Sequence, residues 1–218
     1  MTDPSAVPPP DRELMLAAAP PSSRDALRTL FELDDRLAGI VRTTREPMVG
    51  QMRLAWWHDA LERLDTMPPP AEPLLQDVAR LLLPRGVSGA AIAAMTDGWE
   101  ELVVTDPLNG DALARHADSR GGTLFALAGR LLGAEPAVLR IAGQGWAYAD
   151  LARHLTAAGL ADRASSEARA ALSQAFTATW PAPARAVGVL ALLARLDLEG
   201  GTPLAKAWRV ARFRFTGR

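Results

Sequence analysis

The stretch EPMVGQMRLAWWHDALERLD, residues 46–65, is the most distinctive part of the chain. Its apolar residues recur with the i, i+3, i+4 spacing of a helix that buries one face. Arg53 lies at the edge of this face, one turn from the adjacent pair Trp56 and Trp57. There an arginine can stack on an indole ring or bind an anion. The spacing predicts a buried face made of Met48, Met52, Ala55, Trp56, Ala60 and Leu64.

The composition points to a globular helical protein. The 218 residues are 49% apolar, enough for a sizeable core, and they fit one large domain or two small ones. Alanine, leucine and arginine are frequent and favour helix, while no stretch alternates apolar and polar residues in the manner of a strand. We therefore predict an all-α fold, a single bundle of about 8–10 helices. A proline-rich lead at residues 1–10 is expected to be flexible, and residues 11–218 form the helical domain.

Several function classes are disfavoured by charge and composition. The net charge of −1 provides no overall attraction to nucleic acid, so no nucleic-acid partner is expected. The chain has no cysteine, which excludes disulfides, thiolate metal sites and a cysteine nucleophile. No apolar run reaches the roughly 18 residues of a membrane span, and the proline- and acid-containing N-terminus does not resemble a secretory signal. A cytoplasmic protein is the expectation, with peripheral membrane contact as an addition to it.

One of two adjacent aspartates lies where a carboxylate is unusual. In the predicted helix ending near Arg42, Asp34 shares the apolar face with Leu30 and Leu37, and Asp35 points toward the polar side. A carboxylate on an apolar face is costly unless it is paired or bound to a metal. Asp34 is therefore predicted either to form an ion pair with Arg53 or another arginine, or to bind a metal.

The second half of the chain offers two further candidates. Gly121 and Gly122 interrupt a helical pattern, which indicates a kink, a close helix crossing, or a break where a ligand can approach backbone between Arg120 and Thr123. Asp150 and His154 are four residues apart and share a helical face, a spacing that suits a salt bridge or a divalent cation.

The C-terminal segment is basic and aromatic. No acidic residue follows Glu199, and aromatic side chains are interleaved with basic ones between Thr202 and Arg218. Such a segment can lie on an anionic membrane surface, or it can be an ordinary C-terminal helix whose basic end is favoured by the helix dipole.

Three strings, in order, resemble one family. PMVGQMRLAWWHDALE (47–62) resembles the signature helix of squalene/phytoene synthase-like proteins. ADSRGGTLFALAGRLLG (117–133) resembles the segment leading into that family's second half, and AGQGWAYADLARHL (142–155) resembles the helix with its second acidic motif. Residues 11–41 resemble the opening helices, with the first acidic motif at Asp34 and Asp35. The resemblance thus covers nearly the whole chain.

The resemblance implies an isoprenoid-synthase-type bundle with a central apolar cavity. Working members bind two prenyl diphosphates through Mg²⁺ held by two acidic motifs and join the prenyl chains head to head. Carried onto this chain, it assigns catalytic and metal-binding roles to Asp34, Asp35 and Asp150. It assigns contacts with an isoprenoid diphosphate or a lipid-like ligand to Arg42, Arg45, Arg53, Trp56, Trp57, Arg120, Thr123, Trp146, Arg153 and His154.

Both acidic motifs depart from a working pattern. The first lacks its far acid, because Ala38 and Gly39 follow Asp34 and Asp35, and His154 replaces an expected Asp in the second. Mg²⁺ prefers oxygen ligands, and histidine substitutes poorly for them. The chain looks closer to the degenerate branch that includes assembly factors of respiratory complex I.

Three hypotheses follow from this comparison. The first is a non-catalytic protein that binds an isoprenoid or other lipid or acts as an assembly factor, with no cofactor. The second is an active Mg²⁺-dependent prenyltransferase. The third is a helical interaction module without a ligand.

Overall fold

The computed structural model describes residues 10–134 and 137–218, and every regular element within these ranges is helical. The α-helices are α1 (Pro10–Ala18), α2 (Pro21–Thr43), α3 (Pro47–Arg63), α4 (Pro73–Leu81), α5 (Gly89–Val104), α6 (Gly110–His116), α7 (Thr123–Leu131), α8 (Val138–His154), α9 (Ala158–Ala175), α10 (Arg185–Glu199) and α11 (Pro203–Thr216). A π-helical turn, η2 (Ala117–Gly122), joins α6 to α7 without a break. The all-α prediction is confirmed. Of the lead predicted at residues 1–10, residues 1–9 lie outside the described ranges and Pro10 begins α1.

Local sequence signals explain where many helices begin. Five helices have proline at their first position, where the missing backbone N–H leaves no hydrogen bond unmade. These prolines are Pro10, Pro21, Pro47, Pro73 and Pro203. The side chain of Ser88 caps α5 by accepting a hydrogen bond from the backbone nitrogen of Ala91.

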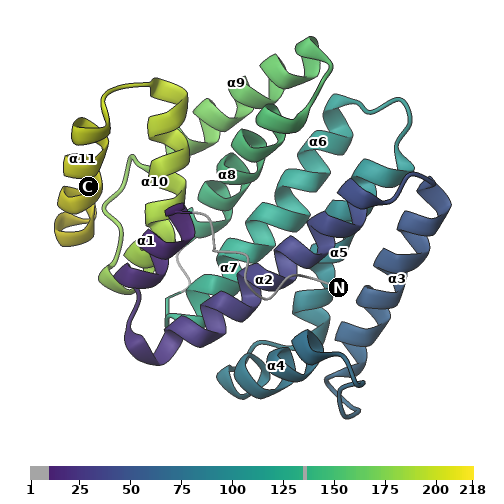
Figure 1. Ribbon diagram of the computed structural model, residues 1–218. Coiled ribbons are helices and arrows are strands. Elements are labelled where there is room, and N and C mark those ends of the chain that lie inside the picture. The colour runs from purple at the N-terminus through teal and green to yellow at the C-terminus, as the bar shows by residue number, and fades with distance from the viewer. Residues whose placement is uncertain (1–9, 135–136) are drawn as a thin grey trace.

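The helices are arranged around α2, which runs through the front of the bundle (Figure 1). In this view α10 and α11 form one end of the molecule and α3 and α4 form the other. The segment from α5 to α8 lies between them and carries the candidate site. No helix within the described ranges combines the length and hydropathy needed to cross a bilayer.

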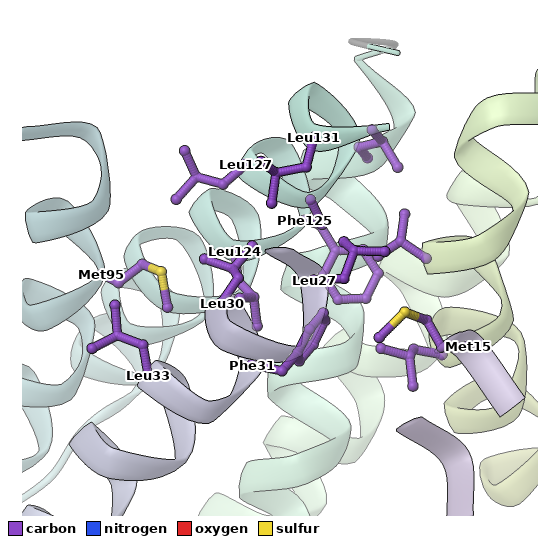
Figure 2. Close-up of a cluster of buried hydrophobic side chains, with 14 of the residues drawn as sticks. Met15, Leu27, Leu30, Phe31, Leu33, Met95, Leu124, Phe125, Leu127 and Leu131 are labelled. Atoms are coloured by element: carbon purple, nitrogen blue, oxygen red, sulfur yellow. The ribbon is translucent and has the colours of Figure 1, made fainter. Parts of the chain in front are cut away.

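The interior around α2 is filled with apolar side chains. Figure 2 shows Leu27, Leu30 and Phe31 of α2 among Leu124 and Phe125 of α7, all of them buried. Met95 of α5 and Met15 of α1 extend the same cluster toward the two ends. The space between these helices is therefore packed core, and the central cavity implied by the resemblance stays a prediction.

The buried face of α3 differs from the one predicted. The buried residues are Gly50, Leu54, Trp57, Leu61 and Leu64. Met48, Met52 and Trp56 instead point outward, with 74%, 67% and 50% of their surface exposed. Both sets have helical spacing. However, the face that carries Met48, Met52 and Trp56 also includes Asp59, whose charge cannot be buried without a partner. The face through Leu54 and Leu61 stays apolar along the whole helix and packs on α5.

A glycine contact fixes the crossing of η2 and α8. A Cβ added to Gly143 would lie 2.0 Å from the backbone oxygen of Gly121, and one added to Gly121 would lie 2.1 Å from the oxygen of Gly143. Side chains at either position would force the backbones apart. Of the alternatives for the Gly121-Gly122 pair, the structure shows a close helix crossing.

The crossing gives a direct stability test. Gly143→Ala should lower the free energy of unfolding by about 3 kcal/mol, because the backbones must separate to admit the methyl group. Gly39→Ala is the matched control, since Gly39 also lies in a helix and nothing lies within 4 Å of its added Cβ. That control should raise stability by about 0.5 to 1 kcal/mol through helix propensity. Urea unfolding followed by circular dichroism measures both, and equal stability of the two variants would contradict the close crossing.

Candidate functional site

Arg120, on the π-helical turn η2, is the centre of the candidate site. Its Nε lies 2.9 Å from Oδ1 of Asp34 and its Nη2 lies 3.0 Å from Oδ2, so the guanidinium donates to both oxygens of that carboxylate. Its Nη1 donates to Oδ2 of Asp150 on α8 at 2.7 Å. Arg120 and Asp34 are almost fully buried, with 3% and 0% exposed. The arginine therefore bridges two acids from helices far apart in the sequence, in the bidentate geometry that guanidinium suits best.

Two indole rings enclose the same guanidinium. Its central carbon lies 4.1 Å from the ring centre of Trp99 and 4.8 Å from that of Trp146. The Nε1 of Trp99 also donates a hydrogen bond to Oδ1 of Asp34 at 3.1 Å. These contacts stabilise the cation through the ring faces while its edge is occupied by carboxylates.

His116 completes this group, one helical turn before Arg120. Its Nδ1 lies 2.6 Å from the backbone oxygen of Gly98, so this nitrogen carries the proton and donates it. Its Nε2 lies 3.5 Å from Nη1 of Arg120 and faces it as an acceptor. Complete burial, together with the nearby charge of Arg120, lowers the pKa of His116 to about 3. The imidazole is neutral at ordinary pH.

The charges of the two acids and Arg120 stabilise one another. Burial disfavours ionised Asp150, but the charge and hydrogen bond of Arg120 outweigh it and lower the pKa to about 2. Burial also disfavours charged Arg120, yet Asp34 and Asp150 together raise its pKa above the ordinary value. Arg120 and Asp150 therefore remain ionised, and no buried side-chain nitrogen or oxygen in the described ranges lacks a hydrogen-bond partner. We call Asp34, Arg120, Asp150, Trp99, Trp146 and His116 the arginine cage.

The arginine cage does not fit Mg²⁺. A divalent cation would need several carboxylate oxygens converging on one point, but a guanidinium lies where those of Asp34 and Asp150 converge. Within residues 10–134 and 137–218, no group of three or more His, Cys, Asp or Glu side chains could hold a metal ion.

Asp34 does form the predicted buried ion pair, but Arg53 is not its partner. Arg53 is exposed and donates to the hydroxyl of Thr44 at 3.1 Å. The partner is Arg120, eighty-six residues away in the sequence. Arg12 of α1 adds a weaker contact, with its Nη2 at 3.9 Å from Oδ2 of Asp34.

The other residues of the first half that were predicted to form a site do not converge on the cage. Asp35 forms an ion pair with Arg12 near the surface. Arg42 and Arg45, at the end of α2 and in the following turn, are exposed. Trp57 is buried under the guanidinium of Arg36, which lies 5.8 Å from its ring centre.

The predicted residues of the second half lie in and around the cage. Trp146 belongs to it, and Arg153 donates to Asp150 at 3.3 Å from the exposed side. The Nδ1 of His154 lies 2.8 Å from the backbone oxygen of Asp150, one turn earlier in the helix. Thr123 lies apart, beside a pocket of about 310 Å³ between α7 and the start of α8.

Three residues of this site were not predicted from the sequence. Trp99 was not among the candidates, although its spacing from Met95 matches a buried stripe. His116 precedes Arg120 by four residues, which is the one local signal that the two side chains share a face. Nothing local to Arg12 indicates its contact with α2.

Comparison with known proteins agrees with the sequence strings. A sequence profile of the family described as squalene/phytoene synthase matches residues 10–164, which is most of the chain and includes the whole arginine cage. No curated protein and no solved structure gave a match.

Neighbouring aspartates test the energetic weight of the cage. Asp34→Asn should lower the free energy of unfolding by about 3 to 5 kcal/mol, because it leaves the buried charge of Arg120 without its bidentate partner. Asp35→Asn removes only a surface ion pair and should cost about 1 kcal/mol or less. Chemical unfolding of both variants measures the difference. Similar losses of stability in the two variants would show that the buried ion pair contributes no more to stability than the surface one.

The pKa of His116 predicts acid sensitivity. The imidazole binds a proton in the unfolded chain below its ordinary pKa of 6.5, but in the folded chain only below about 3. The stability that depends on neutral His116 is therefore complete above pH 6.5 and falls by about 1 kcal/mol per pH unit as the pH decreases toward 3. Asp150, with an ordinary pKa of 3.8 and a folded value of about 2, adds to this loss at lower pH.

Unfolding measured across this pH range checks the prediction. His116→Gln keeps a hydrogen-bonding side chain without a titrating ring, so its stability should change less between pH 6.5 and 4. Parallel pH profiles of the variant and the parent would contradict the assignment.

Proposed function

The chain belongs to the squalene/phytoene synthase family, and we propose that it is a non-catalytic member that works as a binding or assembly protein. One observation carries the proposal: Arg120 lies between Asp34 and Asp150 and donates hydrogen bonds to both. These are two of the three acids to which the family resemblance assigns metal binding, the third being Asp35.

The position of Arg120 between the two acids matters because of the chemistry of prenyl transfer. Ionising an allylic diphosphate requires cations on the leaving group, which Mg²⁺ held by carboxylates supplies. Here the carboxylates are already neutralised by a side chain whose pKa is raised above its ordinary value. Freeing them would leave a buried arginine without its partners, at a cost of several kcal/mol.

The surroundings of both acids support the same reading. The turn after Asp34 and Asp35 continues with Ala38 and Gly39, which carry no metal-binding atoms. The turn after His154 continues with Thr156, Ala157 and Ala158, so this end of the helix adds no further carboxylate beside Asp150. A conserved fold cannot supply an activity whose ligands are missing.

The packed interior favours a function at the surface. Apolar side chains fill the space between α2 and α7. A role in assembly or in contact with lipid requires no internal cavity. Accordingly, we place the working part of the protein on its exterior.

A turnover assay tests the proposal. With Mg²⁺ and farnesyl or geranylgeranyl diphosphate, the purified protein should release diphosphate no faster than a protein-free control, and an active enzyme of the family serves as the positive control. Mg²⁺ alone should leave the thermal unfolding midpoint unchanged, because the carboxylates that would bind it are paired with Arg120. Mg²⁺-dependent diphosphate release that Asp150→Ala abolishes, with helicity intact, would establish an active prenyltransferase instead.

A further inference from the structure

Helix α11 presents an apolar surface that nothing in the described structure covers. It lies at one end of the molecule, beyond α10 and far from α3 (Figure 1). It also lies beyond residues 10–164, which match the family profile. We propose that α11 is an interfacial helix that docks the protein on an anionic lipid bilayer, an inference independent of whether the arginine cage is catalytic.

The inner side of α11 is fixed to the bundle. Val210 and Phe213 are buried, and Phe213 packs edge-on against Trp180 at a ring distance of 5.7 Å. The side chain of Thr202 caps the first turn, and the backbone nitrogen of Trp180 donates to the oxygen of Gly217 at 3.0 Å. The helix is therefore already folded and oriented, so docking requires no ordering of the chain.

The outer side of α11 is a continuous apolar stripe. Leu204, Trp208, Ala211 and Phe215 follow one another at the i, i+4, i+7, i+11 spacing of a single helical face. Leu204, Trp208 and Phe215 have 81%, 64% and 84% of their surface exposed. Side chains of this size are rarely exposed together unless they contact a partner or a membrane.

The basic residues of α11 are sorted between its two sides. On the inner side Lys206 pairs with Asp197 at 2.6 Å and Arg209 with Glu199 at 2.7 Å. On the outer side Arg212 and Arg214 flank the stripe, and within the described ranges neither forms an ion pair with an acidic side chain. The guanidinium of Arg212 lies 5.6 Å from the ring centre of Trp208. Positive charge is thus compensated where the helix meets the bundle and uncompensated beside the exposed apolar stripe.

This combination fits an anionic bilayer better than a second copy of the chain. A helix that lies in the membrane interface inserts its apolar face and keeps basic side chains at the level of the lipid headgroups. Trp208 and Arg212 have the amphipathic form that this boundary favours. A second copy docked on the same stripe would bring Arg212 and Arg214 close to their own counterparts, and the like charges would repel.

Vesicle flotation tests the proposal with the full-length protein. The vesicles contain phosphatidylcholine alone, or phosphatidylcholine with about a third phosphatidylglycerol. We expect the apparent affinity to be at least roughly tenfold higher for the anionic vesicles, since each arginine near the surface contributes about fivefold. Added salt should remove most of this preference because the attraction is screened.

Two double variants and one control assign the binding to α11. Trp208→Ser with Phe215→Ser should abolish flotation, and Arg212→Gln with Arg214→Gln should remove the anionic preference while leaving helicity unchanged. Met48→Ser with Trp56→Ser is the matched control, because it removes exposed apolar surface from α3 at the opposite end. This control should float like the parent.

Three results would overturn the proposal. They are absence of flotation with anionic vesicles, flotation that survives in the Trp208 and Phe215 variant, and equal binding to neutral vesicles. Light scattering provides a further check, since a dimer that dissociates in the same variant would assign the stripe to self-association instead.

Discussion

The buried positive charge of Arg120 is the constraint on which the centre of this protein depends. A guanidinium removed from water needs hydrogen-bond acceptors around it, and here both its edge and its faces have partners. Asp34 of α2 and Asp150 of α8 occupy its edge, while Trp99 of α5 and Trp146 of α8 cover its faces. Because these groups come from separate helices, satisfying one cation fixes the relative positions of α2, α5, η2 and α8.

The backbone around Arg120 is built for this close approach. The guanidinium can reach both acids only if η2 lies deep between α5 and α8. Gly98 permits contact on one side, since a Cβ there would lie 2.6 Å from the backbone nitrogen of Arg120. Gly121 and Gly143 permit contact on the other. The π-helical turn changes the helical register at this point, as such turns often do at functional sites.

The sequence predicts the fold better than it predicts the partners within it. Composition and periodicity lead to an all-α chain, and the cost of an unpaired buried carboxylate leads from Asp34 to an ion pair. The choice of Arg120 over Arg53 depends on the tertiary arrangement, because arginine side chains are long and several lie at plausible helical positions. The buried face of α3 depends on it in part, since Met48 and Met52 also have helical spacing, and only the packing against α5 shows that Leu54 and Leu61 are buried instead. Trp99 and His116 each have one local signal in the sequence, but their common partner Arg120 is apparent only once α5 lies beside α6 and η2.

On the non-catalytic function that we propose, Arg120 also explains how a family fold can persist without the family's metal chemistry. Two acid-bearing helices that face each other across an interior repel unless a cation lies between them. In a working synthase, as the resemblance implies, Mg²⁺ supplies that charge when substrate binds. Here the chain carries its own permanent cation, fixed by a bidentate contact to Asp34 and by two indole rings. The helices can then pack closely without a bound metal, as α2 and α7 do around their shared apolar side chains. On the proposed non-catalytic function the exterior is the place for function, and on α11 uncompensated charge and exposed apolar surface occur together.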